Sequence, residues 1–333
     1  MLQIVTKKGK GYEPAEADPE TYHSVNRKGA EAGALESAAV VGDTLCTLAS
    51  EREDVVAICA AMAKATGLSA FQKQFPDRFY DVGIAEEHAV TFAAGLAKGG
   101  ARPFVAIYSS FLQRSYDQIL HDVALQNLPV TFLIDRAGFV GGDGKTHQGL
   151  FDLSYLSQIP NIKIWTPSTY SELSQMIQCS LYENCPVAIR YPKRLSSDKR
   201  DFVGRWNVLL PCDNPRLTLL AVGANLTATA LRLADAIPSV EVVDVTTVKP
   251  LDKNYLNGVK NGVVVTLEEN VLQGGFGQSV AEYLEKNNVG VRVTNLGVND
   301  TFVKHATVEE QLTANGLDFD SLLETITEIL SKC

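Results

Sequence analysis

The chain has 333 residues, a formal net charge of −9, 45% hydrophobic residues and 21% charged residues. This composition is typical of a globular protein, and at roughly 150 residues per domain the length predicts two domains. An acidic chain is not expected to offer the clustered lysines and arginines of a nucleic-acid-binding surface. No apolar run approaches the ~18 residues of a membrane span and no signal peptide opens the sequence, so we expect no nucleic acid and no membrane as partner, and a cytoplasmic location.

The first 28 residues fit neither predicted domain. Three lysines and two glycines between positions 7 and 11 are followed by Pro14 and Pro19. Such a composition is typical of a connector rather than of a packed element. We interpret residues 1–28 as a connector, or as the tail of a further domain.

Short apolar runs alternate with helical patterns between residues 29 and 194. Continuous apolar strands separated by helices are typical of a parallel sheet covered on both faces, which predicts a three-layer α/β domain. The strands are expected at residues 55–58, 79–82, 103–107, 130–134, 162–165 and 187–190.

A polar stretch with two prolines, residues 195–215, is interpreted as a linker between domains. The alternation then resumes over residues 216–333, with strands expected at 217–222, 240–245, 263–266 and 291–296. The second unit is therefore also predicted to be α/β with a mainly parallel sheet, and it is not a repeat of the first.

An acidic pair opens one helix of the first unit. The segment 81–90 (DVGIAEEHAV) leads from a strand into one apolar helix face that we expect to end at Gly99 and Gly100. Glu86, at this helix start, can hold a flat, nitrogen-rich ring by a charge-assisted hydrogen bond. The alternative, which this segment alone favours, is an acidic pair stabilised only by the helix dipole.

Polar and aromatic residues also gather in the loops after the predicted strands. Ligands of open α/β sheets bind beyond the carboxyl ends of the strands, so these loops predict one site. A single loop arginine is usually a surface charge, but several at one edge suit a phosphate-bearing substrate. The candidates are Tyr108, Phe111, Arg114, Asp135, Arg136, Asp143, His147 and Arg190.

The six cysteines form no Cys-x-x-Cys pair. This argues against a metal site with that spacing and against a disulfide framework in a chain of this size. Cys59, inside an apolar run, is expected to be buried.

Ten segments together resemble the 1-deoxy-D-xylulose-5-phosphate synthase family. They follow in order along nearly the whole chain and distinguish it from ordinary transketolases. The segments are 75–78 (FPDR), 81–95 (DVGIAEEHAVTFAAG), 107–118 (IYSSFLQRSYDQ), 135–138 (DRAG), 146–149 (THQG), 151–155 (FDLSY), 188–192 (AIRYP), 248–252 (VKPLD), 268–270 (EEN) and 274–277 (GGFG).

The resemblance implies a fold and an activity. The fold is a transketolase-type pyrimidine-binding domain followed by a transketolase C-terminal domain. The activity is that of a thiamine-diphosphate-dependent transferase, which condenses pyruvate with glyceraldehyde 3-phosphate, releases carbon dioxide and serves isoprenoid and thiamine biosynthesis. The family also implies Mg²⁺ and a homodimer.

The resemblance also assigns roles to residues. Glu86 matches the glutamate that binds N1′ of the aminopyrimidine, and Phe111 the aromatic ring that stacks on it. His147 and His23 match active-site histidines, whereas His88 and His121 are expected to be structural. The residues that match the group gripping the phosphosugar acceptor are Tyr108, Arg114, Arg136, Asp143 and Arg190. The second unit is expected to contribute subunit packing and a cleft wall, without a catalytic residue.

One feature of the family is missing. Family members carry an N-terminal diphosphate-binding domain, and segment 5–15 resembles only its closing part. Gly142-Asp143-Gly144 looks like the start of the metal–diphosphate motif, but the window 167–171 (PSTYS) lacks the asparagine that completes it. We therefore interpret this tripeptide as part of a flexible substrate loop, and expect the Mg²⁺ ligands on the missing domain.

The chain is accordingly expected to be a C-terminal half that is inactive without the diphosphate-binding domain or a partner polypeptide. An engineered fragment, a proteolytic remnant and a split-gene product stay open as origins. The alternative functions are the C-terminal subunit of a split transketolase and a non-catalytic remnant. The joint presence of the site residues favours the enzyme.

Overall fold

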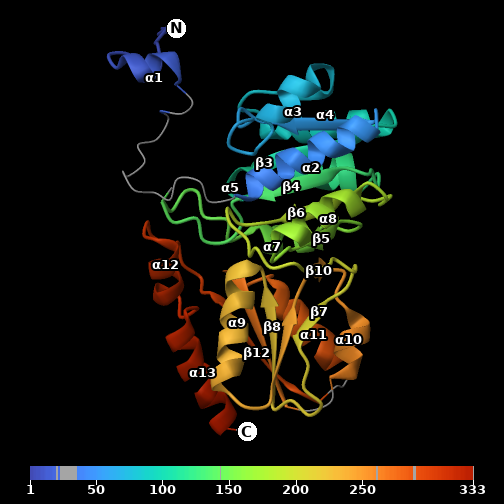
Figure 1. The fold of residues 1–333 in the computed structure, drawn as a ribbon, viewed down its shortest axis with the longest axis vertical. Helices are drawn as coiled ribbons and strands as arrows, with labels where there is room; N and C mark the ends of the chain where they lie inside the picture. Colours follow the sequence, from blue (N-terminus) through green and yellow to red (C-terminus); the bar gives the residue numbers. More distant parts are fainter. Residues whose placement is uncertain (20–21, 23–35, 143, 260–261, 288–289, 333) are drawn as a thin grey trace. The chain divides into compact units, whose positions relative to one another are not determined.

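The computed structural model describes residues 1–19, 22, 36–142, 144–259, 262–287 and 290–332 (Figure 1). The chain divides into two units, residues 1–35 and 36–333. In the first unit, helix α1 (Glu13–Ala17) follows a turn, and the Lys7 ammonium pairs with the Glu16 carboxylate.

Residues 36–333 begin with an α/β domain whose sheet is mainly parallel, which confirms the predicted fold class. The strand order is β10-β5-β6-β4-β3-β1-β2, and β10 is antiparallel to β5. Each run predicted as a strand forms one. The strands are β1 (Val55–Cys59), β2 (Phe79–Asp81), β3 (Arg102–Tyr108), β4 (Thr131–Asp135), β5 (Lys163–Trp165) and β6 (Val187–Arg190), with β10 (Thr247–Lys249) added from further along the chain.

Helices cover both faces of this sheet. Since successive strand residues point to opposite sides, each strand contributes to the core on both faces. Val55, Ala57 and Cys59 pack in one core cluster with α2 and α8, whereas Val56 and Ile58 pack in another with α4. Cys59 is buried, as expected. The helices of this domain are α2 (Ser37–Glu51), α3 (Ser69–Gln74), α4 (Glu86–Lys98), α5 (Ser109–Leu112), α6 (Tyr116–Gln118), α7 (Asp152–Ser157) and α8 (Tyr170–Ser180).

The remaining chain forms a second α/β domain with the strand order β12-β11-β8-β9-β7. Helices α9 and α13 lie side by side over one face of this sheet (Figure 1), and α11 packs against the other. The elements are β7 (Asn207–Leu210), β8 (Leu217–Val222), α9 (Ala224–Ala236), β9 (Val240–Asp244), α10 (Lys253–Gly258), β11 (Val263–Val271), α11 (Phe276–Lys286), β12 (Arg292–Val298), α12 (Val308–Ala314) and α13 (Phe319–Ser331).

Two short strands were not expected. Strand β7 lies inside residues 195–215, which the sequence suggested as a linker, and pairs antiparallel with β9. Strand β10 follows β9 but joins the edge of the first sheet through β5. Both are edge strands held by backbone hydrogen bonds, so their side chains carry little of the apolar signal used for prediction.

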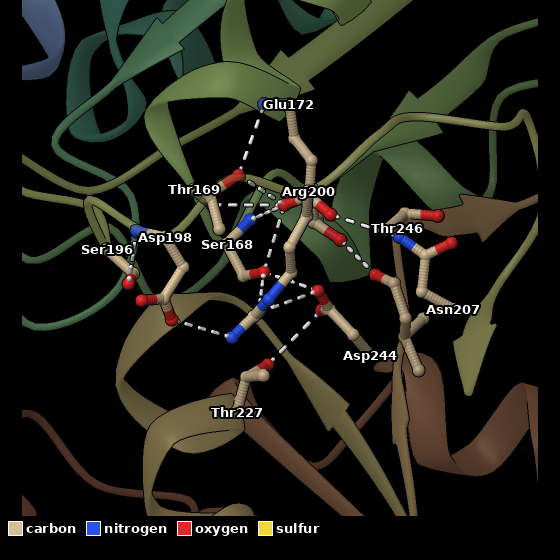
Figure 2. A network of polar contacts seen from close by, with 12 residues as sticks. Ser168, Thr169, Glu172, Ser196, Asp198, Arg200, Asn207, Thr227, Asp244 and Thr246 are labelled. Carbon is tan, nitrogen blue, oxygen red and sulfur yellow. Dashed lines mark hydrogen bonds and ion pairs between the residues drawn. The ribbon is translucent and has the colours of Figure 1, made fainter. Parts of the chain in front are cut away.

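A buried polar network joins the two domains (Figure 2). Glu172 of α8 accepts hydrogen bonds from Ser168 and Thr169, and from Asn207 Nδ2 of β7 at 3.1 Å. Ser168 Oγ also contacts Asp244, at the end of β9, and accepts from Arg200 Nη1 at 3.0 Å. The segment after β6 therefore connects both domains through side chains as well as through the chain itself.

None of the helices in the described ranges combines the length and the apolar character needed to cross a membrane.

Candidate active site

The carboxylate of Glu86 is buried at the first residue of α4, with 3% of the residue exposed. The turn before it is shaped by Asp81, whose Oδ1 accepts from the backbone N–H groups of Ala61 at 2.7 Å and Gly83 at 3.0 Å. Apolar residues of α4 pack into the core, and the helix ends where Gly99 caps it, as predicted. Local sequence therefore delivers a carboxylate to the carboxyl edge of the sheet.

Arg114 is the ionic partner of this carboxylate. Its Nη1 donates to Glu86 Oε2 at 3.2 Å, and its side chain is half exposed whereas that of Glu86 is not. An arginine that reaches from solvent to a buried carboxylate can be displaced by a ligand nitrogen, since water compensates the guanidinium that leaves.

An aromatic and cationic cluster surrounds Phe111. The Tyr108 and Phe111 rings stack with centroids 5.7 Å apart, and the His147 ring meets Phe111 edge-on at 5.3 Å. The Arg136 guanidinium carbon lies 4.8 Å from the centre of the Tyr108 ring. The structure thus brings together Tyr108, Phe111, Arg136 and His147, four of the predicted site residues.

Arg136 adopts a backbone conformation that is uncommon for a side chain of its size. Its φ is +58°, in the left-handed region that residues other than glycine adopt mainly where surrounding contacts enforce it. Arg136 Nη1 donates to both carboxylate oxygens of Asp135, at 2.9 and 2.7 Å. Burial raises the pKa of Asp135, and the paired arginine opposes that rise.

Arg190 lies at the end of β6, but its guanidinium is used within the protein. Its Nε donates to both oxygens of Asp152 at 2.8 Å, and its Nη2 to the carbonyl oxygens of Gly149 at 3.1 Å and Glu269 at 2.7 Å. The side chain is 4% exposed. Arg190 therefore connects the first domain to β11 of the second.

The remaining predictions concern the histidines and Asp143. His147 Nδ1 lies 2.9 Å from Thr146 Oγ1. His88 stacks with Phe92, and His121 Nδ1 lies 2.8 Å from Asp117 Oδ1. His23 and Asp143 lie outside the described residues.

The sequence analysis did not predict a role at the site for three buried polar residues. Asp152, Glu269 and Gln311 are buried, and each contacts the loops of the site or a residue that does. The signal for Glu269 was present, because two glutamates end an otherwise apolar strand run. Nothing local distinguishes Gln311 from a surface glutamine of an amphipathic helix.

The residues fit the aminopyrimidine ring of thiamine diphosphate. A buried carboxylate at a helix start provides the acceptor for a ring nitrogen, and the half-buried Phe111 offers an aromatic face. Beside Phe111, the buried Ser110 Oγ has no hydrogen-bond partner among the described residues. The same part of the chain contains no group of three or more His, Cys, Asp or Glu side chains arranged to hold a metal ion.

Comparisons with protein families agree with this architecture. Residues 34–198 match the transketolase pyrimidine-binding domain, and residues 204–322 match the transketolase C-terminal domain. Similar curated proteins include 1-deoxy-D-xylulose-5-phosphate synthases of Syntrophus aciditrophicus (45% identity, 99% of this chain and 54% of the relative), Carboxydothermus hydrogenoformans (45%, 100% and 56%) and Clostridium tetani (41%, 99% and 56%).

Solved structures are similar over most of the chain. A split-gene transketolase described as an inactive β4 tetramer superposes with a TM-score of 0.78 at 29% identity, covering 90% of this chain and 99% of that one. A transketolase of Campylobacter jejuni gives a TM-score of 0.74 at 20% identity, covering 88% of this chain and 46% of that one. At that identity the second match shows the fold alone.

The chain spans about half the length of the curated relatives it matches. Two transketolase domains follow one another in the expected order, and the similarity to synthases extends along the whole chain. The chain therefore belongs to the transketolase family and is similar throughout to the C-terminal portion of 1-deoxy-D-xylulose-5-phosphate synthases.

Proposed function

We propose that this chain provides the pyrimidine-binding and acceptor-binding part of a 1-deoxy-D-xylulose-5-phosphate synthase. Such an enzyme is a thiamine-diphosphate-dependent transferase that condenses pyruvate with glyceraldehyde 3-phosphate and releases carbon dioxide. The observation that carries the proposal is the buried Glu86 carboxylate at the start of α4, paired with the half-exposed Arg114. The 41–45% identity to synthases along the whole chain supports the same activity.

Glu86 and Phe111 would hold the cofactor's aminopyrimidine ring. When bound, thiamine diphosphate supplies the electron sink for decarboxylation of a 2-keto acid. Glu86 would hold the aminopyrimidine ring by a hydrogen bond to its ring nitrogen, and the burial of Glu86 would strengthen that bond because little water competes for the carboxylate. Phe111 would offer its ring face and would keep water from one side of the aminopyrimidine ring.

The acceptor phosphate would be bound by arginines with unequal roles. Arg114 is half exposed and holds Glu86 through one nitrogen, so its guanidinium can turn to a phosphate. Arg136 is committed to Asp135 through Nη1, and Arg190 to Asp152 and two carbonyl groups. We infer that Arg114 contributes most to phosphate affinity and that Arg190 acts chiefly by holding the loops in place.

Other assignments complete the proposal. We assign Tyr108 and Asp143 to the acceptor, and His147 to proton transfer or acceptor orientation beside Phe111. His23 stays a predicted active-site histidine. The diphosphate and Mg²⁺ would be bound by a diphosphate-binding domain, on the same polypeptide or on a partner, in a homodimeric enzyme located in the cytoplasm.

A second candidate is the C-terminal subunit of a split transketolase. It is favoured by the structural match to a split-gene transketolase chain that this chain covers almost completely. Such an enzyme would transfer a two-carbon ketol unit between sugar phosphates without decarboxylation. Carbon dioxide release from pyruvate therefore separates the two candidates.

The test measures 1-deoxyxylulose 5-phosphate formation from pyruvate and glyceraldehyde 3-phosphate, with thiamine diphosphate and Mg²⁺. It is run with the chain alone and with a diphosphate-binding polypeptide supplied. We expect product only with that polypeptide, together with one carbon dioxide per product. Ketol transfer between sugar phosphates without carbon dioxide would support the split transketolase instead, and no reaction with either substrate pair would support a non-catalytic remnant.

A further inference from the structure

The second domain holds the glycine-rich loop (residues 138–142 and 144–149) that carries His147. The backbone N–H of Phe139 donates to Glu269 Oε2 at 3.0 Å, and that of Gly141 donates to Gln311 Oε1 at 3.1 Å. His305 Nε2 lies 3.1 Å from the carbonyl oxygen of Gly142. These three side chains come from the end of β11, from α12 and from the segment before α12, so the contacts all cross the domain boundary.

Burying the Glu269 carboxylate for this contact costs free energy. It is 5% exposed, and a buried carboxylate loses its hydration unless hydrogen bonds replace it. Burial raises the pKa of Glu269, while the Phe139 N–H, the charge of Arg190 and a hydrogen bond from the Asn225 side chain act in the opposite direction. A carboxylate kept here against that penalty indicates a specific requirement for the loop.

The backbone of the glycine-rich loop allows Glu269 to come close to it. A Cβ atom on Gly138 would lie 2.5 Å from Glu269 Oε2, and the φ of Gly138 is +82°, so only glycine fits there. Gly138 and Gly149 exchange two backbone hydrogen bonds that close the loop. Arg190 holds the carbonyl oxygen of Gly149, so both ends of the loop are anchored.

Gln311 is built to hold the other contact. It is 1% exposed, and its Nε2 donates to the carbonyl oxygen of Lys304 at 2.9 Å, which leaves Oε1 directed at the Gly141 N–H. Its side chain thus accepts from the loop and donates to its own domain.

The neighbouring Glu268 provides the contrast. It is also buried, but its two oxygens accept from Phe276 and Gly277, each at 2.9 Å, at the start of α11 in its own domain. Successive strand residues face opposite ways, so the Glu268 carboxylate binds the start of α11, whereas the Glu269 carboxylate reaches the loop in addition to Asn225 of its own domain.

We propose that Glu269 and Gln311 are positioning residues, through which the second domain fixes the glycine-rich loop and hence places His147 beside Phe111. The meaning of that placement for acceptor binding rests on the proposed function. The anchoring itself does not, because it concerns only contacts within this chain. The second domain would then position the acceptor-binding loop rather than only pack against the first domain.

The first experiment measures amide hydrogen exchange of the full chain, peptide by peptide. In Glu269→Leu and Gln311→Leu, exchange over residues 138–142 should rise about tenfold or more, because local opening no longer breaks a hydrogen bond to the second domain. Glu269→Gln keeps an oxygen acceptor and should restore most of the protection. The matched controls are Glu268→Leu, which should expose the start of α11, and Gln175→Leu, which removes a similar glutamine contact to the backbone of Phe202.

Loop exchange that stays unchanged in Glu269→Leu and Gln311→Leu would overturn the proposal. So would an equal rise across the whole chain in these variants and in both controls, since that describes general destabilisation. Gln311→Leu keeps the test decisive if Glu269→Leu does not fold.

The second experiment measures kinetics after the diphosphate-binding polypeptide is supplied. The loop variants should raise the KM for glyceraldehyde 3-phosphate about tenfold, leave carbon dioxide release from pyruvate alone unchanged, and be rescued by Glu269→Gln. An unchanged acceptor KM in a variant with a loosened loop would refute positioning for the acceptor. Complete inactivity of the wild type would instead count against the proposed function, while the exchange result would still decide whether the loop is anchored.

Discussion

Glu86 and Glu269 are both buried carboxylates, yet they hold different kinds of partner. Glu86 pairs with Arg114, which solvent can reach, so a ligand can replace Arg114 as the partner of the carboxylate. Glu269 accepts from a backbone N–H that has no other described use, and losing that contact would leave a buried donor unsatisfied. The first arrangement suits exchange with a ligand and the second suits permanent anchoring.

Replacing Glu86 tests the cofactor assignment. In the reconstituted enzyme, Glu86→Ala should lower turnover about 100-fold or more, because a positioned proton-transfer group contributes typically 10²–10⁴-fold. Glu86→Gln, which keeps the shape but cannot accept the proton, should be nearly as impaired. Turnover is measured beside thermal melting, and near-normal turnover in a folded Glu86→Ala variant would disprove the assignment.

Arg114 and Arg190 should respond differently to substitution. Arg114→Ala should raise the KM for glyceraldehyde 3-phosphate about 10- to 100-fold, the range expected for hydrogen bonds to a charged group, and should spare carbon dioxide release from pyruvate alone. Steady-state kinetics with each substrate varied would check it. Equal loss in both half-reactions would instead indicate that Arg114 acts mainly through Glu86.

Arg190→Ala should primarily destabilise the fold. Removing the guanidinium leaves the buried Asp152 carboxylate without its ionic partner. Breaking a buried ion pair in this way typically costs about 3–5 kcal/mol of stability. Urea denaturation measures the loss, with Arg102→Ala as a control at a partly buried arginine whose Nη1 donates to the carbonyl oxygen of Glu183 and not to a buried carboxylate. An Arg190→Ala variant with wild-type stability and a raised KM for glyceraldehyde 3-phosphate would instead support direct phosphate binding by Arg190.

At the scale of elements, short edge strands account for most of what the sequence did not predict. Strands β1, β4 and β8 are buried along their length and were recognisable as apolar runs. Strand β7 alternates partly buried and exposed residues, and β10 has only three residues. Each is defined by its pairing with a distant strand, and periodicity within a short window does not report such pairing.

The junction of α8, β7 and β9 should be sensitive to pH. Burial and the nearby Glu172 raise the pKa of Asp244 to about 7, with Arg200 and the hydroxyls of Ser168 and Thr227 opposing the rise. Ser168 Oγ lies near both carboxylates (Figure 2), and since a hydroxyl carries one proton, a protonated Asp244 can satisfy the second contact.

The sign of the pH effect follows from proton binding. Between the unfolded pKa of about 3.9 and the folded value, the native state binds more protons, so stability falls as pH rises through this window. Asp244→Asn should remove this contribution, so its melting temperature relative to wild type should increase from pH 5 to pH 8, by about 2–4 °C for each kcal/mol. Melting curves at both pH values check it, and a constant difference would refute the assignment.

At the scale of the whole molecule, residues 36–333 behave as one unit because the core crosses the domain boundary. One cluster of buried residues contains Ile164 and Leu153 of the first domain together with Trp206 and Phe276 of the second. The Trp206 indole N–H donates to the carbonyl oxygen of Thr247 in β10 at 2.7 Å. Strand β10 then completes the edge of the first sheet.

The two domains should consequently not be separable. A fragment of residues 36–198 would lose β10 and expose apolar residues of the shared core, so we expect aggregation or a broad, non-cooperative thermal transition. The control fragment, residues 36–333, should melt like the full chain. A soluble 36–198 fragment with a sharp transition near that of the full chain would contradict this expectation.

The sequence by itself determined the features that depend on local pattern. Apolar runs of strand length gave the parallel sheets, and an acidic pair before an apolar helix face placed Glu86 at a helix start. The clustering of Tyr108, Arg136 and Phe111 followed from the rule that parallel strands end at one edge. Each inference needs only residues near one another in the chain, or a topology that the whole pattern implies.

Only the tertiary structure decided which partner each polar group has. Arg190 and Arg114 look alike in the sequence, yet one guanidinium is enclosed by Asp152 and backbone carbonyl groups while the other reaches solvent. Glu268 and Glu269 are neighbours, yet the Glu268 carboxylate binds the start of α11 and the Glu269 carboxylate reaches Phe139 of the other domain. The physical reason is that hydrogen bonds are directional and short-ranged, so a partner 130 residues away is known only when packing has brought it within about 3 Å.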